Sequence, residues 1–352
     1  KYLKLYKIES SLADYNEDNL ENSLSFLHEN NDFFLGLNAS IFETLKDSTN
    51  DEHEYILPEI TIGKNLFSNN LLGNLDLQSN LKVHNYETNK TTKFLTNDFN
   101  WDIKDFNFKS GLNSKLFGKI RNVNYETKNV ENFKENSSNE LFGAIGLLSE
   151  LNLYKQISDG AKHLLTPKVL LRYSPDHMRP ETAGNRLKTS NIFTLDRLDS
   201  PNNLESGINA TVGLDYEINT KSNEFNFSAG QIYSKKYNKD MPDTTSLDKK
   251  TSDFVASSIL KIKDKFEFNY NFNVDESFDD LTYNEFGAKF NFNPVNFDFR
   301  YLEERKHVGD KKYFNTNLNF ENDNRKISFG TKRNLVTDSA EFYNLSYEYL
   351  ND

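Results

Sequence analysis

The stretch NLESGINATVGLDYEIN, residues 203–219, alternates between two kinds of side chain. Every second residue lies on a mostly apolar face, and the residues between them are polar or glycine. The apolar face carries Ser206, Ile208, Ala210, Val212, Leu214, Tyr216 and Ile218. A period of two indicates a β-strand, because successive side chains of a strand point to opposite faces of the sheet. Ordinary globular strands run about 5–6 residues, whereas a tilted strand needs about 9–11 to cross a bilayer. The stretch therefore predicts a long strand with two different faces.

The same alternation recurs along most of the chain. It is most regular in the C-terminal half, where Phe266, Phe268, Tyr270 and Phe272 alternate with polar residues. The pattern predicts about fourteen antiparallel strands. Short connections such as 293–296 alternate with long ones such as 304–312 and 235–253. Short turns on one side and long loops on the other are typical of an outer-membrane barrel.

The composition also favours a membrane barrel over a soluble core. Apolar residues make up only 36% of the chain, yet aromatic residues reach 14%, with 29 Phe and 18 Tyr. A transmembrane barrel combines a polar lumen, an apolar outer face and aromatic residues at the membrane interfaces. No run of about 18 apolar residues is present, which argues against transmembrane helices but not against strands.

Charge and residue usage narrow the function classes. The net charge of −11, with 42 basic residues scattered among 53 acidic ones, argues against a nucleic-acid partner. Cysteine is absent, and none of the six histidines has a second His or Cys at metal-ligand spacing. No G-x-S-x-G, P-loop or G-x-G-x-x-G motif is found. The sequence therefore predicts neither an enzyme nor a cofactor site.

Alternation alone also fits a soluble antiparallel sandwich. Three observations favour the membrane barrel: the strands are long, the 15 glycines and seven prolines are few for so many hairpins, and aromatic residues gather on the predicted outer face. A passive porin or receptor-type barrel is the first alternative. A soluble β-rich binding module is the second.

Three segments carry a resemblance to a known family. They are LLTPKVLLRYSP at 164–175, NIFTLDRL at 191–198 and LESGINATVGLDYEI at 204–218. A strand ending in an R-Y-S-P-like corner, a loop with N-x-F-x-x-D-R-L and a long strand opened by an acid and a glycine follow in that order. This order resembles the C-terminal outer-membrane barrel of the LptD family of lipopolysaccharide-assembly proteins. The terminal segments KYLKLYKIES and EFYNLSYEYLND also resemble its Asn- and Lys-rich alphaproteobacterial members.

The resemblance implies an assembly protein in the outer membrane of a Gram-negative cell. Its substrate would be lipopolysaccharide, with the sugar passing through the lumen and the lipid leaving through a seam in the wall. Its partners would be a plug lipoprotein of the LptE type and a periplasmic bridge protein of the LptA type. We expect residues 1–352 to form one part of the barrel wall, without the family's N-terminal jelly roll, its closing strand or its cysteines. Gate residues are therefore not assigned.

Six residues are candidates for positions that face the lumen or orient a loop. Polar side chains on inner faces offer exchangeable hydrogen bonds to a sugar-rich substrate, which points to Asn209, Thr211 and Asn269. Arg172, Asp196 and Arg197 lie in the family-like block. We expect each of these three to orient its loop through charge-assisted hydrogen bonds, and a structural role is favoured.

Four local features are harder to interpret. The acidic segment NVDESFDD at 273–280 is a Ca²⁺ candidate, but it lacks the ligand spacing and central glycine of a dedicated site, so a solvated loop is favoured. Pro58 marks an edge, a bulge or a strand start. Residues 86–104, which contain Trp101, read as strand plus loop, and residues 1–28 hold two possible strands, KYLKLYKIE and SLSFLH.

Overall fold

The computed structural model describes residues 19–44, 53–87, 89–131, 133–157, 160–307 and 309–349 as an all-β protein of 18 strands. The strands are β1 (Asn19–Asn30), β2 (Phe33–Thr44), β3 (His53–Asn69), β4 (Gly73–Tyr86), β5 (Lys90–Asn107), β6 (Leu112–Lys128), β7 (Ser138–Leu151), β8 (Leu153–Gln156), β9 (Lys162–Ser174), β10 (Gly207–Asn219), β11 (Asn223–Ser234), β12 (Phe254–Ile262), β13 (Phe266–Val274), β14 (Leu281–Phe292), β15 (Val295–Glu304), β16 (Lys311–Asn322), β17 (Arg325–Asn334) and β18 (Ser339–Tyr349). In this part of the chain, no helix is long and apolar enough to cross a membrane.

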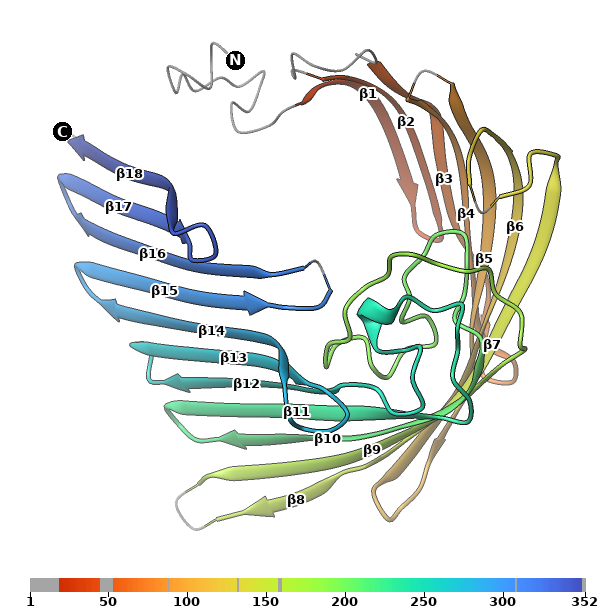
Figure 1. The fold of residues 1–352 in the computed structure, drawn as a ribbon. Coiled ribbons are helices and arrows are strands. Elements are labelled where there is room, and N and C mark those ends of the chain that lie inside the picture. Colours follow the sequence, from red (N-terminus) through yellow and green to blue (C-terminus); the bar gives the residue numbers. More distant parts are fainter. Residues whose placement is uncertain are drawn as a thin grey trace.

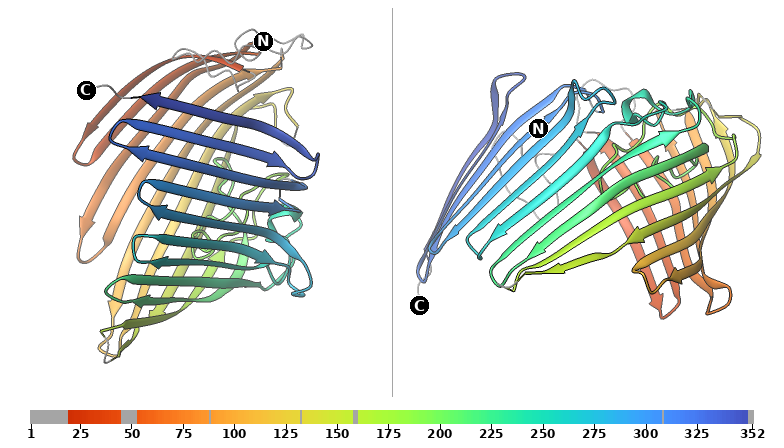
Figure 2. Two further views of the ribbon diagram at one scale, coloured as in Figure 1. Left: turned by 90° about the vertical axis from the view of Figure 1, so that its left-hand side faces the viewer. Right: turned by 90° about the horizontal axis from the view of Figure 1, so that it is seen from below.

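The strands form one antiparallel sheet in which neighbours in sequence are neighbours in space. Each strand from β1 to β6 pairs with the next, and so does each strand from β9 to β17. Strands β7 and β8 pair with successive parts of β9 and so act as one interrupted strand. The sheet curls into a wall around a central space, the lumen, and its strands share a common tilt (Figures 1 and 2). Within the described residues β1 and β18 have one neighbour each, so the sheet is open there.

The predicted antiparallel β class is confirmed, but the predicted number of about fourteen strands is too low. Strand β5 runs unbroken through the Trp101 region, where a loop was expected. Strand β12 was not predicted, because its mix of serines and aliphatic residues hides the alternation. The possible strand SLSFLH lies within β1, and KYLKLYKIE lies outside the described residues.

Connection lengths alternate as predicted, except that the connection after β4, at 87–89, is also short. The connections after β1, β3, β5, β10, β12, β14 and β16 are short, whereas those after β9 and β11 are the longest, at 175–206 and 235–253. Pro58 lies within β3 where the pairing with both β2 and β4 shifts register, so it occupies a bulge. A bulge accommodates proline because the ladder already lacks a hydrogen bond there.

Around β10 the wall is polar inside and apolar outside. Along β10, Ile208 and Val212 are 44% and 47% exposed on the outer face, whereas the intervening Asn209 and Thr211 are 5% and 0% exposed. Cross-strand partners share a face, so the register extends this assignment to the neighbouring strands. On β9 the apolar Leu171 is 54% exposed. A soluble sheet buries the opposite set of side chains, whereas a lipid-facing barrel requires this one.

The two longest connections fold back inside the curve of the wall, and we call them the lumenal loops (residues 175–206 and 235–253) (Figure 1). The second contains a short 3-10 helix, Asp243–Thr245. Their buried apolar residues form two clusters against the inner wall. One cluster contains Met178, Leu187, Ile192, Leu198, Ile232, Met241, Leu247 and Val255, and the other contains Phe94, Val123, Tyr125, Phe142, Ala144, Leu195 and Leu204. The protein's apolar core therefore lies between loops and wall.

Candidate functional site: ion pairs between the lumenal loops and the wall

The site is built around residues 195–198 of the first lumenal loop, Leu-Asp-Arg-Leu. The two leucines enter different apolar clusters, with Leu195 in the cluster on β5–β7 and Leu198 in the cluster on β11–β12. The two charged side chains between them bind different strands. Four consecutive residues thus attach the loop to several parts of the wall.

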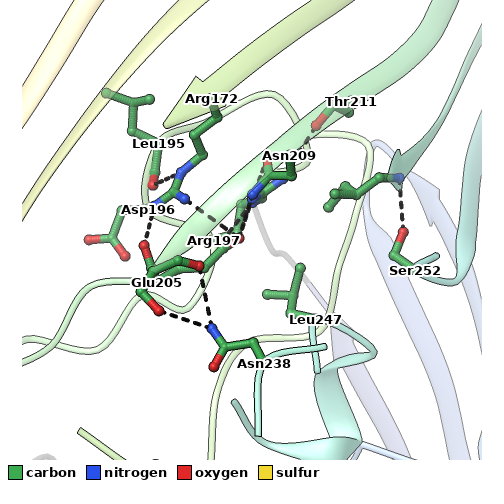
Figure 3. Close-up of polar contacts among 12 residues, drawn as sticks. Arg172, Leu195, Asp196, Arg197, Glu205, Asn209, Thr211, Asn238, Leu247 and Ser252 are labelled. Carbon is green, nitrogen blue, oxygen red and sulfur yellow. Dashed lines mark hydrogen bonds and ion pairs between the residues drawn. The ribbon is translucent and has the colours of Figure 1, made fainter. Parts of the chain in front are cut away.

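Arg197 is completely buried and binds Glu205 through both ends of its guanidinium group (Figure 3). Its Nε donates to Glu205 Oε2 at 2.8 Å, and an Nη atom donates to Oε1. The same guanidinium donates to Asn209 Oδ1 at 3.0 Å and to Thr211 Oγ1 at 3.3 Å on β10. This bidentate, charge-assisted geometry is the strongest pairing open to arginine. Arg197 therefore holds the loop to the inner face of β10.

Arg172, on β9, reaches the same site from the wall. Its Nε donates to the carbonyl oxygen of Leu195 at 2.9 Å, and an Nη atom donates to the carbonyl oxygen of Glu205. Its second Nη atom has no hydrogen-bond partner and lies 3.8 Å from the Glu205 carboxylate. Gly146 on β7 lets the side chain of Leu195 lie close to the wall, because a Cβ there would lie 2.8 Å from a methyl carbon of Leu195.

The carboxylate of Glu205 is the single negative group between these two arginines. Burial alone would raise the pKa of the Glu205 carboxyl, but the charges of Arg197 and Arg172 outweigh burial and lower it below its usual value. Asn209 adds a hydrogen bond to Oε1 at 3.2 Å. The site is therefore a charged cluster held in one geometry, with all its members away from bulk water.

A second network lies on β5 and β6. Arg121 binds both oxygens of Asp98 at 2.6 Å and donates to the carbonyl oxygen of Asn203 at 2.6 Å. Asp196 of the loop joins this pair through Lys119 at 3.0 Å and Arg121 at 3.2 Å. The two carboxylates and two cations alternate, so each charge has opposite charges as neighbours. Asp196 thus attaches the loop to β6 as Arg197 attaches it to β10.

Arg179 makes a third attachment near the start of the first lumenal loop. It forms an ion pair with Glu140 on β7, and its guanidinium lies 4.7 Å from the centre of the Phe133 ring and 5.3 Å from that of Tyr125. Asn203 donates to the carbonyl oxygen of Arg179 at 2.8 Å. A guanidinium between aromatic faces gains a cation–π attraction.

The structure brings together five of the six predicted residues. Arg172, Arg197, Asn209 and Thr211 share the Glu205 cluster, and Asp196 lies next to it in the Asp98 network. The side chain of Asn209 bonds within the cluster, and the hydroxyl of Thr211 also donates to the carbonyl oxygen of Ile192 in the first lumenal loop. Asn269 is separate and half-buried on β13, where its amide lies over Gly287. The functional role of these residues stays a prediction.

Sequence reasoning did not single out Asp98, Arg121 or Arg179, and it used Glu205 only as the acid that opens the family-like strand. Each was one charge among many in an acidic chain. The β5–β6 register places Asp98 opposite Arg121, and this pairing follows from register rather than from either strand alone. One sequence feature could have pointed to Asp98 and Arg121: both lie at inward positions of their strands, where a charge without a partner is costly.

The acidic segment at 273–280 is a tight loop whose carboxylates already have partners. Asp275 accepts the backbone N–H groups of Asp279 and Asp280 at 2.9 and 3.1 Å. Glu276 pairs with Lys249, and Asp280 pairs with Arg305. Within the described residues, no group of three or more His, Asp or Glu side chains is arranged to hold a metal ion.

An antiparallel wall with apolar residues outside, polar residues inside and long loops folded into its lumen defines an outer-membrane barrel type of protein. The model of the LptD family, described as LPS transport system D, matches residues 1–342. The chain therefore belongs to the LptD family, a family of lipopolysaccharide-transport proteins of the outer membrane and not one of enzymes. A search of curated proteins found no match.

Proposed function

We propose that this protein moves lipopolysaccharide to the outer leaflet of the outer membrane, with the sugar part of the molecule passing through the lumen. Membership of the LptD family supports this activity. The observation that carries the proposal is the sorting of side chains across the wall, apolar toward lipid and polar toward the lumen. An amphiphile needs both environments next to each other.

The lumenal loops divide the wall into two parts. In the described part of the chain their side-chain hydrogen bonds and ion pairs reach β5–β7 and β9–β15, which we call the loop-covered wall. Strands β1–β4 and β16–β18 receive none, and we call them the open wall. We assign the sugar path to the space beside the open wall. Arg172, Asp196 and Arg197 would keep the loops out of this path.

Partners complete the proposal. A plug lipoprotein would occupy part of the lumen, and a periplasmic bridge protein would deliver lipopolysaccharide to the barrel. Both follow from family membership, and we propose neither contact residues nor a gate.

The decisive experiment is depletion of the full-length protein in its own cells. We expect lipopolysaccharide at the cell surface, measured by antibody binding to intact cells, to fall while uptake of small hydrophilic solutes stays unchanged. The passive-porin alternative predicts the reverse: slower solute uptake with normal surface lipopolysaccharide. Complementation with the unmodified gene controls for secondary effects of depletion.

A further inference from the structure

A polar pocket lies between the first lumenal loop and the strands β12–β14, away from the Glu205 cluster. Its volume is about 250 Å³. Arg186, Lys188 and Ser190 come from the loop, and Asn271 and Glu285 come from the strands. Ligand pockets for drug-sized molecules enclose about 300–1,000 Å³, so this one suits a single sugar residue.

The pocket has a free cation. Lys188 is exposed, and among the described residues its ammonium group forms no hydrogen bond and no ion pair. Beside it, Arg186 binds Glu304 at 2.5 Å and lies with its guanidinium 3.2 Å from the centre of the Tyr283 ring. The Nε atom of Arg186 is buried without a hydrogen-bond partner. The Lys188 ammonium group is therefore the cation that is open to a ligand, and the Arg186 guanidinium adds a second positive charge beside it.

His307 lies close to the charged side chains of the pocket, which act on its pKa. His307, in the loop after β15, has a lowered pKa because of burial; the Glu304 carboxylate opposes the shift, and the charges of Arg186 and Lys188 add to it. Its Nδ1 atom is also buried without a hydrogen-bond partner. Arg186 and Lys188 thus place two positive charges beside His307, together with the negative charge of Glu304.

The strand side of the pocket supplies groups that bind hydroxyls. Glu285 accepts hydrogen bonds from Asn271 at 3.1 Å and from Tyr283 at 2.8 Å, and both go to its Oε2 atom. These bonds fix the carboxylate and leave Oε1 able to accept from a ligand. Asn271 keeps its amide oxygen, and Ser190 keeps its hydroxyl.

We propose that this pocket binds an acidic sugar residue of the transported molecule, with its anionic group on Lys188 and Arg186 and its ring hydroxyls on Glu285 and Asn271. The proposal rests on the proposed function, because the ligand arrives through the lumen. A lipid chain does not fit, since the pocket is lined mainly by polar groups. A neutral sugar satisfies the strand side but leaves Lys188 without a partner.

The first test is binding by the purified full-length protein in detergent. The probe is delipidated core oligosaccharide that carries phosphate, and a neutral oligosaccharide is measured alongside it by calorimetry. We expect Lys188→Ala to weaken binding of the acidic probe by about tenfold or more, because it removes a charge-assisted hydrogen bond. Binding of the neutral probe should change little. Lys239→Ala, an exposed lysine of the other lumenal loop, is the matched control and should bind like the unmodified protein.

Equal affinity of the Lys188 and Lys239 variants for the acidic probe overturns the proposal, as does failure of the unmodified protein to bind it. Heat-modifiable gel mobility of each variant shows that the barrel is folded. Because Lys188 is exposed, its replacement leaves no buried partner charge behind.

The second test separates this pocket from the proposed function as a whole. A photo-crosslinking residue is placed in cells at Ser190, in the pocket, and separately at Asn317, on the inner face of the open wall. Adducts with lipopolysaccharide at both positions support both proposals. Adducts at Asn317 alone overturn the pocket and leave transport standing, whereas no adduct at either position contradicts the assigned path.

Discussion

The loop-covered wall and the open wall are made of the same kind of strand but use their inner faces differently. On the loop-covered wall, inward charges such as Asp98 and Arg121 are buried and paired with one another or with the lumenal loops. On the open wall, inward residues such as Asn38 and Ser25 are half-buried or exposed and bond mainly to their neighbours. The polar inner face therefore binds the lumenal loops on the loop-covered wall, whereas it contacts water on the open wall.

This contrast has an energetic meaning. Buried ion pairs contribute through the cost of breaking them, because removal of one partner leaves a desolvated charge. Exposed polar pairs exchange readily with water and contribute little. We therefore expect equivalent substitutions to have large effects on one wall and small effects on the other.

The largest expected effect is that of Arg197→Ala. Loss of this guanidinium leaves the buried Glu205 carboxylate with Arg172 alone, which should cost about 3–5 kcal/mol of unfolding free energy. The measurement is urea unfolding of the refolded protein in detergent. Lys332→Ala, which removes an inward cation paired with Glu341 on the open wall, is the control and should cost no more than about 1 kcal/mol. Similar costs for the two variants would remove the distinction between the walls.

A smaller effect is expected for Asp98→Asn. Arg121 loses its bidentate carboxylate but keeps its bonds to the carbonyl oxygens of Ser200 and Asn203, so the cost should be about 1.5–3 kcal/mol. Unfolding of the double variant Asp98→Asn/Asp196→Asn measures the coupling between strand and loop. Additive costs would show that Asp196 attaches the loop independently of this pair.

The third prediction concerns pH. The folded pKa of Glu205 is lowered from 4.5, so its contribution is complete above about pH 4.5 and is lost as the pH falls through the folded value. As the pH is lowered from 7 to 3 we expect the protection factors of the backbone amides of residues 191–198, which compare the measured exchange with its intrinsic rate at each pH, to fall, while those of β2 and β3 change less. The Arg197→Ala variant should lose this acid dependence, because Arg197 is a main cause of the lowered pKa. Equal acid sensitivity in the two regions would contradict the assignment to Glu205.

The smallest effect is expected on the open wall. Asn317→Ala removes one side-chain hydrogen bond, to Asn315 at 3.4 Å, and should change the unfolding free energy by no more than about 0.5 kcal/mol. The same urea titration measures it. A cost as large as that of Asp98→Asn would show that the open wall also relies on its inner polar residues.

Much of the wall was predictable from sequence, because the period of two is a local property of a strand. The faces of β10 and β13 follow from alternation alone, and the structure places their apolar residues outward as expected. The missing N–H donor of Pro58 predicted an edge, a bulge or a strand start, and the structure has the bulge. Strand β12 was missed because its residues do not separate into an apolar set and a polar set.

The candidate site was only partly predictable. Arg172, Asp196 and Arg197 were found because they lie in a family-like segment, but their partners Glu205, Arg121 and Asp98 were not. Arg121 and Asp98 come from strands far from Asp196 in the sequence, and no local pattern connects these positions. Glu205 lies only eight residues after Arg197 in the same loop, but an irregular loop has no periodic pattern that pairs the two.

The sequence by itself determined the strands, their two faces and the positions of the long loops, since each of these depends on residues close together in the chain. Only the tertiary structure decided that the loops fold inward, which polar side chains they bury and which they leave to water. The physical reason is that strand register and loop placement decide whether an inward charge meets an opposite charge or solvent. Asn209 and Asn269 illustrate this, because similar strand patterns place one inside a buried ion-pair cluster and leave the other half-buried on the inner face of β13.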